Sequence, residues 1–100
     1  MSPSRLDITR AALAEFCRAN HIRRLSLFGS ILREDFTEES DVDVLVEFEE
    51  GHVPGLRFFG IQRELSELLG RKVDLHTPRS LSPYFRQEVL SEAEVHYDAA

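Results

Sequence analysis

An alternating segment near the middle of the chain constrains the fold more than any other feature. From Asp41 to Phe48 the residues alternate as in a strand with one buried face and one open face. The side chains expected to face the core are Val42, Val44, Val46 and Phe48. Those expected on an open, partly wet face are Asp41, Asp43, Leu45 and Glu47. The pattern predicts a sheet with a valine-lined core side and a carboxylate-bearing side.

Helical and strand-like signals cover most of the remaining chain. Apolar spacing and capping residues predict helices over about Arg5 to Ala19, Leu56 to Leu69 and Pro83 to Leu90, with a further turn or two over Ile31 to Glu34. Strands are expected over Ile22 to Phe28, Val42 to Phe48 and Lys72 to His76, and the last residues are expected to pair weakly or fray. These elements predict an α/β (α+β) fold: a small mixed sheet of about three strands, with helices packed on one face and an open carboxylate-bearing face.

The composition restricts the class of protein. With 100 residues, the expectation is a single domain spanning residues 1–100. The lone cysteine, Cys17, excludes an intrachain disulfide and is expected in the core, and no apolar run is long enough for a membrane span. These features indicate a reduced, cytoplasmic protein that does not bind a membrane. The formal net charge of −6 disfavours direct binding to nucleic acid.

Three aspartates lie on strand-like segments at spacings that suit metal binding. Asp41 and Asp43 are two residues apart, so both side chains point to the same face of a strand, and Asp74 lies within the later strand. Mg²⁺ prefers oxygen ligands and is usually held by one or two carboxylates plus substrate phosphates. We therefore expect two Mg²⁺ ions bridged by Asp41 and Asp43, with Asp74 completing the site of the ion that activates an attacking hydroxyl.

A glycine turn precedes this aspartate pair. Gly29-Ser30 follows an apolar strand, and ten residues separate Ser30 from Asp41. The backbone N–H groups of the turn and the Ser30 hydroxyl are expected to hold a triphosphate. Arg33, one helical turn on, would contact phosphate as a planar donor, and Ser40 would contact phosphate or cap the turn. The arrangement predicts metal-assisted phosphoryl or nucleotidyl transfer.

Each part of this site also has a simpler interpretation. A lone D-x-D on a strand is often surface alternation, a Gly-Ser pair is usually a turn, and Arg33 with Asp35 would form a surface ion pair worth under about 1 kcal/mol. The combination of all parts on successive strands favours a joint site. Four histidines lack the spacing of a zinc site: His21, His52, His76 and His96. His76 shares the expected face of Asp74, but the prediction there is a surface histidine at a strand end.

The motif Leu27-Phe28-Gly29-Ser30, followed after ten residues by Asp41-Val42-Asp43-Val44, resembles the signature of the DNA polymerase β-type nucleotidyltransferases. Val73-Asp74-Leu75 matches the third carboxylate of that family, and the short chain resembles its minimal members, the MNT proteins. The resemblance implies nucleotide binding by Gly29 and Ser30 and Mg²⁺ binding by Asp41, Asp43 and Asp74. It also implies transfer of a nucleoside monophosphate, AMP from ATP, to an acceptor hydroxyl with loss of pyrophosphate.

MNT proteins are commonly encoded beside a HEPN-domain partner in toxin–antitoxin pairs. The resemblance therefore implies a hetero-oligomer in which the acceptor is a tyrosine of the HEPN toxin, and the modification silences the RNase activity of that toxin. The alternative is a non-catalytic antitoxin that neutralises a partner by complex formation, suggested by apolar residues at Leu81, Tyr84, Phe85 and Leu90. A third interpretation is transfer to a small molecule or an RNA end.

Overall fold

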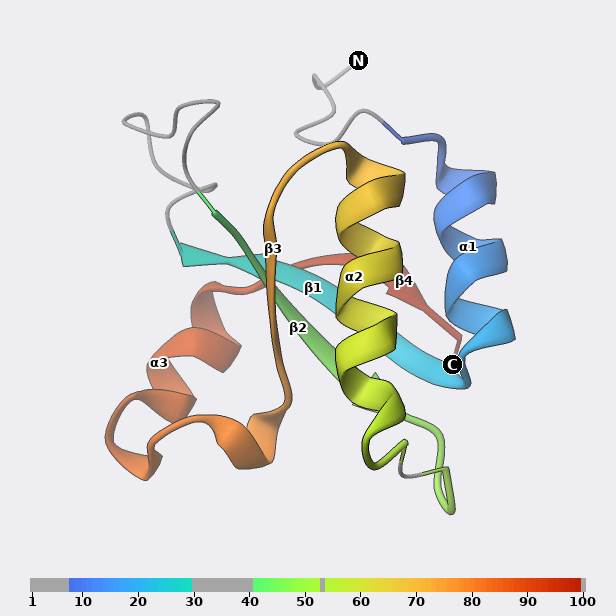
Figure 1. Ribbon diagram of the computed structural model, residues 1–100. Helices are drawn as coiled ribbons and strands as arrows, with labels where there is room; N and C mark the ends of the chain where they lie inside the picture. The colour runs from blue at the N-terminus through green and yellow to red at the C-terminus, as the bar shows by residue number, and fades with distance from the viewer. Residues whose placement is uncertain (1–7, 30–40, 53, 100) are drawn as a thin grey trace.

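A mixed sheet forms the centre of the computed structural model, which describes residues 8–29, 41–52 and 54–99 (Figure 1). Within these residues the sheet has four strands in the order β3-β2-β1-β4: β1 (Ile22–Phe28), β2 (Val42–Phe48), β3 (Val73–His76) and β4 (Glu94–Asp98). β1 is antiparallel to β2 and β4, and β2 is parallel to β3. The mixed α/β class is as predicted. The additional strand is β4, formed by terminal residues for which the sequence predicts only weak pairing.

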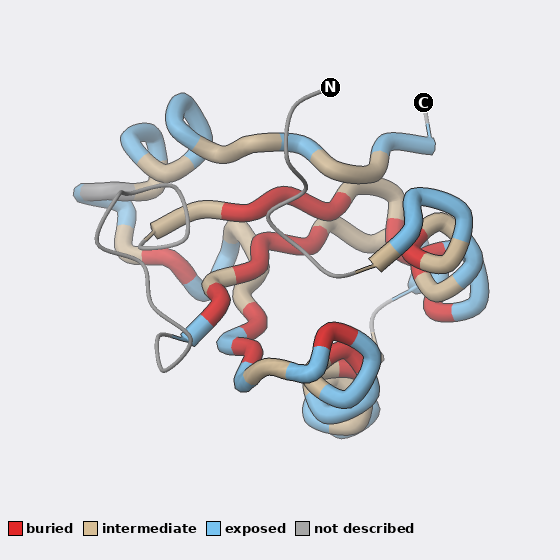
Figure 2. The backbone as a smooth tube through the Cα atoms, turned by 90° about the horizontal axis from the view of Figure 1, so that it is seen from above, coloured by how far each residue is buried: buried red, intermediate tan, exposed pale blue. Residues whose placement is uncertain are grey.

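The buried side of the sheet is the valine-lined side, as predicted. Leu25 of β1 lies opposite Val46 of β2, so the apolar rows of the two strands share one face. This face is covered by α1 (Arg10–Ala19) and α2 (Arg57–Leu69) (Figure 1). The two helices contribute the buried core residues Leu13, Cys17, Ile61, Leu65 and Leu69. Figure 2 shows the buried residues gathered in the central strands and on parts of these helices.

Cys17 packs into this core, as predicted. Its side chain is 0% exposed, and burial raises the pKa of the thiol to about 12, an effect that the neighbouring Arg18 opposes only in part. The thiol is therefore protonated at neutral pH and contributes to the fold through packing.

The first helix begins later than its apolar spacing suggests. α1 starts at Arg10, whereas the sequence pattern predicts a start near Arg5. Thr9 is extended, and its Oγ1 accepts a hydrogen bond from Ala12 N at 3.1 Å. The side-chain cap satisfies a backbone donor that has no partner within the helix and so fixes where the helix begins.

The other helix ends follow the sequence signals closely. α2 ends at Gly70, as predicted, where the left-handed φ of 67° suits glycine. α3 (Pro83–Glu92) begins after Ser82, whose Oγ accepts a hydrogen bond from Tyr84 N at 3.3 Å, also as predicted. The turn of helix expected over Ile31 to Glu34 lies outside the described residues. Of the helices that are described, none is both long and apolar enough to cross a membrane.

The second side of the sheet is open only in part, which corrects one expectation. Leu45, predicted on a partly wet face, is only 2% exposed. Its partner on β1, Ser26, is also buried, and the short 3-10 helix η2 (Pro78–Ser80) contacts β2. α3 lies on this side of the sheet, opposite α1 and α2 (Figures 1 and 2). The open part of this face includes the end of β2 and β3 that carries the carboxylates.

Candidate active site

Parallel pairing of β2 with β3 brings two of the predicted carboxylates side by side. Asp43 and Asp74 are direct partners in the register of the two strands, so both side chains lie on the same face. Asp41 lies one residue before β2, and its Oδ2 is 4.0 Å from the Nζ of Lys72. The side chain of Asp43 is 26% exposed and that of Asp74 is 55% exposed. The pair is thus open to a ligand on one side and supported by the sheet on the other.

The backbone of Gly29 lies close to the carboxylate of Asp43. Gly29 follows β1 directly, and the last residue of that strand, Phe28, is paired with Asp43. Gly29 has a φ of +78°, and a Cβ atom added there would collide with Oδ2 of Asp43 and lie 3.1 Å from its Cγ. Both the positive φ and the close approach require glycine at this position. Glycine at this position therefore allows the backbone after β1 to pack closely against Asp43.

His76 completes the group, which corrects its interpretation as a surface histidine. Its Nε2 lies 3.2 Å from Oδ2 of Asp74 and 3.5 Å from Oδ1 of Asp43, and its ring makes an edge contact with Phe28 at a centroid distance of 5.2 Å. Nε2 is buried and has no partner with hydrogen-bond geometry within the described part of the chain. The sequence signal for this residue is its spacing of two from Asp74, which puts both side chains on one face of β3.

The electrostatics of this group favour a bound cation. The pKa of Asp43 is raised, mainly because burial disfavours its charged form, and the carboxylates of Asp74 and Asp41 raise it further. The nearby imidazole of His76 opposes the shift. Negative charges held this close repel one another, so a divalent cation placed between them would relieve the repulsion.

The donor set fits the metal that the sequence predicts. One ligand atom from each of Asp43, Asp74 and His76 can be chosen so that all three lie within 4.8 Å of one another. Carboxylate oxygens suit Mg²⁺, and the imidazole nitrogen of His76 adds a donor that suits softer ions better. Asp43 and Asp74, with Asp41 beside them, are therefore the residues that would hold Mg²⁺.

Part of the predicted site lies outside the described residues. Ser30, Arg33 and Ser40, expected to bind phosphate, all belong to the stretch 30–40 between β1 and β2. The structure brings together the remaining four predicted residues, Gly29, Asp41, Asp43 and Asp74, at one end of the sheet.

A cavity at the other end of β2 contains none of these carboxylates. It has a volume of about 800 Å³ and lies between the C-terminal end of β2, the β2–α2 loop and η2. Phe48, Phe58 and Phe59 contribute apolar surface to it. Its charged lining residues are Arg23, Arg79, Glu47, Glu49 and Glu50. The chemistry of the carboxylates, rather than the size of this hollow, identifies the candidate active site.

A glycine turn beside carboxylates on neighbouring strand ends defines a class of metal-assisted nucleotidyl-transfer proteins, and comparison with known families agrees. The family model described as "Nucleotidyltransferase domain" matches residues 10–96. The chain therefore belongs to the nucleotidyltransferase family, and it is an enzyme of that type. Within the family it is similar to minimal members: a solved structure described as a minimal nucleotidyltransferase is 39% identical, with a TM-score of 0.70, covering 84% of this chain and 85% of the other.

Two relatives carry more specific names. Protein adenylyltransferase MntA of Thermococcus cleftensis is 42% identical over 72 residues, which cover 71% of each chain. A protein of Methanocaldococcus jannaschii, MJ0435, whose name assigns it provisionally as a protein adenylyltransferase, is 42% identical over 72 residues, or 72% of this chain and 76% of the relative.

Two more distant structures share the fold. A toxin–antitoxin crystal structure with AMP-PNP has a matching chain with a TM-score of 0.72 and 22% identity, covering 91% of this chain and 74% of the other. A complex of a tri-AMPylated HEPN toxin of Shewanella oneidensis with its MNT antitoxin gives a TM-score of 0.64 at 22% identity, covering 89% of this chain and 69% of the other. At this level of identity the likeness supports the fold of the present chain.

Proposed function

We propose that this chain is a Mg²⁺-dependent protein adenylyltransferase that moves AMP from ATP to a tyrosine hydroxyl of a HEPN toxin, and so acts as an antitoxin in the cytoplasm. The observation that carries the proposal is the register of Asp43 with Asp74, with the backbone of Gly29 packed against Asp43. This arrangement puts metal-binding oxygens next to a turn able to approach a phosphate.

The residues of the site have separable roles in such a transfer. Asp41, Asp43 and Asp74 would hold Mg²⁺, and the bound metal would stabilise charge on the entering and leaving oxygens. The turn that begins at Gly29 would position the triphosphate. The acceptor oxygen forms a bond to the α-phosphorus of ATP, the bond from that phosphorus to the bridging oxygen breaks, and pyrophosphate leaves. Asp74, the more exposed of the paired carboxylates, would take the hydroxyl proton.

The choice of AMP and of a HEPN acceptor rests on similarity. The relatives at about 40% identity are named protein adenylyltransferases, and distant structures with the same fold are toxin–antitoxin complexes, one of them with AMPylated toxin. The matched region covers 76% and 71% of the length of these two relatives.

A complex-forming antitoxin without catalysis is the second candidate, favoured by the surface of α3. The side chains of Tyr84 and Leu90 are 97% and 45% exposed. Leu81, which the sequence places in the same apolar group, is only 5% exposed and belongs to the interior. The remaining apolar surface of α3 suits a protein contact, and a contact of this kind could serve either candidate function.

The test identifies the acceptor and separates the two candidates. The untagged chain is incubated with Mg²⁺, each of the four nucleoside triphosphates and a HEPN toxin as the acceptor, and the products are mapped by mass spectrometry. We expect AMP on a tyrosine of the HEPN protein with ATP, no product with D43N, and wild-type product with E64Q, an exposed control on α2. Full neutralisation of the toxin in cells by D43N would instead support the complex-forming antitoxin.

A further inference from the structure

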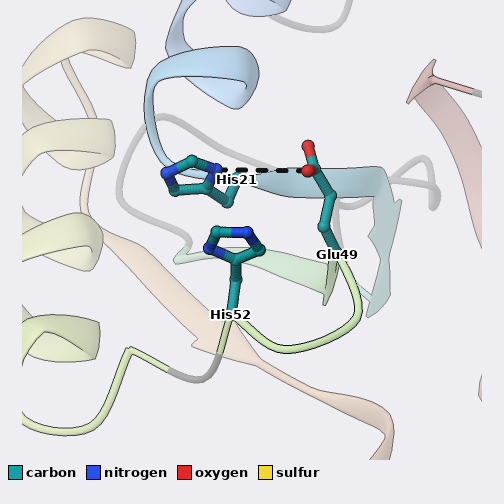
Figure 3. A group of neighbouring side chains, drawn as sticks. All are labelled: His21, Glu49 and His52. Atoms are coloured by element: carbon teal, nitrogen blue, oxygen red, sulfur yellow. Dashed lines mark ion pairs between the residues drawn. The ribbon is translucent and has the colours of Figure 1, made fainter.

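A second group of potential metal ligands lies at the opposite end of β2. His21 occupies the turn between α1 and β1, Glu49 follows β2 directly, and His52 lies in the β2–α2 loop. Figure 3 shows the two imidazole rings stacked one above the other, with the Glu49 carboxylate beside His21. With a rise of about 3.3 Å per strand residue, Glu49 is about 20 Å from Asp43. The group is therefore separate from the candidate active site.

The distances within this group suit a shared ion. The ring centroids of His21 and His52 are 3.9 Å apart with an angle of 11° between the planes, and Nδ1 of His21 lies 4.0 Å from Oε1 of Glu49. One ligand atom from each residue can be chosen so that all three lie within 4.8 Å of one another. The lone pairs of an imidazole lie in the plane of its ring, so the two near-parallel rings must turn out of their stack before both nitrogens can face one ion. The exposure of the side chains leaves room for that rotation.

Backbone hydrogen bonds hold the three residues in place. The N–H of Glu49 donates to the carbonyl of His21 at 2.8 Å, and the N–H of His52 donates to the carbonyl of Glu49 at 3.0 Å. His21 has a φ of +56°, the one positive φ outside glycine among the described residues. Histidine adopts this left-handed conformation more readily than most residues other than glycine, and here it occurs in the turn before β1. The side chains are exposed, but the backbone that carries them is fixed.

The chemistry of the group selects a class of metal. Two imidazole nitrogens and one carboxylate oxygen suit a borderline ion such as Zn²⁺, whereas Mg²⁺ prefers oxygen ligands alone. A cavity beside the two rings is lined by Asn20, Pro54, Arg57 and Ile61 in addition to the two histidines. It gives room for a fourth ligand, and the positive charge of Arg57 favours water or an anion there.

We propose that His21, Glu49 and His52 form a Zn²⁺ site that ties the α1–β1 turn to the β2–α2 loop, apart from the carboxylate site. Bound Zn²⁺ would link two segments that connect the sheet to its two covering helices. The stacked histidines and the neighbouring carboxylate carry the proposal by their positions and do not depend on the activity of the enzyme.

The test measures metal binding by the full chain without a histidine tag. After removal of metals with EDTA, Zn²⁺ affinity is measured against a chromophoric chelator, and Co²⁺ is added to read the coordination from its visible spectrum. We expect one tight Zn²⁺ and a Co²⁺ spectrum typical of a tetrahedral site. H52A should weaken Zn²⁺ binding by at least about 100-fold, beyond the 10–100-fold lost when an outer-shell partner of a metal site is removed.

Two further variants control for misfolding and for Zn²⁺ binding at another histidine. H21N removes the imidazole but keeps a residue that tolerates positive φ, so its fold should survive while its Zn²⁺ affinity falls as in H52A. In the wild type, His96 pairs with Glu94 and is not one of the three proposed ligands. H96A should therefore bind Zn²⁺ as the wild type does. Saturating Zn²⁺ should raise Tm by about 10 °C in the wild type and in H96A, and not in H21N or H52A.

The outcomes separate this proposal from the proposed function. Wild-type Zn²⁺ affinity in both H21N and H52A would overturn the zinc site. Loss of Zn²⁺ binding in D43N alone would also overturn it, because the ion would then belong to the carboxylate site. AMP transfer by H52A at the wild-type rate, together with Zn²⁺ binding by D43N, would support two independent sites.

Discussion

The two ends of β2 carry groups of similar composition in very different surroundings. At one end, Asp43, Asp74 and His76 extend from neighbouring parallel strands and are partly shielded by the sheet. At the other end, His21 and His52 lie on a turn and a loop and are exposed to solvent. Burial raises the pKa of Asp43 at the first end, and its carboxylates favour an oxygen-binding cation. The same few residue types can thus form a site for phosphate chemistry or a site that links two loops, depending on which elements carry them.

Removal of metal should produce the largest difference between the carboxylate site and the histidine group, measured as the rate of AMP transfer. EDTA should lower AMP transfer by at least about 1000-fold, because the carboxylates would no longer hold the ion that stabilises the developing charge. Mg²⁺ should restore the rate, measured with α-labelled ATP and the HEPN partner. One equivalent of Zn²⁺, enough to fill the histidine group, should not restore it. Full activity in EDTA would contradict the role assigned to the carboxylates.

Replacement of Gly29 tests the close approach at the carboxylate end. G29A should lower the free energy of unfolding by about 2–4 kcal/mol and impair transfer, because alanine must adopt a positive φ and its Cβ collides with Asp43. G60A is the matched control: Gly60 lies within α2, and an added Cβ would meet no atom within 4 Å. That variant should gain up to about 1 kcal/mol. Equal denaturation curves for the two variants would show that the turn is not constrained as described.

Replacement of His76 should have a smaller effect on the carboxylate site. Its imidazole holds down the pKa of Asp43, so H76A should raise that pKa further. The acid limb of the transfer rate should then move to higher pH, so the loss of rate should be largest at the acid end of the profile. H96A is the control, since His96 pairs with Glu94 on β4. A pH profile unchanged in H76A would remove His76 from the electrostatics of the site.

The smallest expected effect concerns stability without metal. Because the pKa of Asp43 is higher in the folded chain than in the unfolded chain, the folded state binds its proton more tightly. The contribution of this group to stability is therefore present at acid pH and lost as pH rises through the folded pKa. Metal-free D43N should be slightly more stable than the wild type at neutral pH, and the gain should shrink in acid. Urea denaturation at both pH values measures this, and a loss of stability at neutral pH would contradict it.

Local sequence signals were sufficient for most of the sheet and its carboxylates. The alternation after Asp41 identifies the buried face of β2, and the glycine at position 70 and the serine at position 82 mark helix ends. β4 could not be predicted with the same strength, because the residues of Glu94–Asp98 are only half-buried or exposed and the pairing of the strand depends on contact with β1. The burial of Leu45 likewise depends on segments distant in the chain.

The positions of His76 and of the pair His21 and His52 likewise depend on contacts between segments distant in the chain. His76 has a local signal, its spacing from Asp74, but its approach to Asp43 depends on the pairing of β2 with β3. His21 and His52 have no motif spacing at all, and they meet because the α1–β1 turn and the β2–α2 loop lie at the same end of the sheet. Spacing in the sequence finds sites built on one strand or one helix, whereas loops brought together by the fold leave no such pattern.

The most direct test of the account is the single-turnover rate of AMP transfer to the HEPN partner, measured side by side for wild type, D43N and H52A. We expect equal rates for wild type and H52A and a rate at least about 1000-fold lower for D43N, with D43N still folded by circular dichroism. Transfer by D43N at the wild-type rate would contradict the assignment of the Asp43–Asp74 pair as the catalytic metal site.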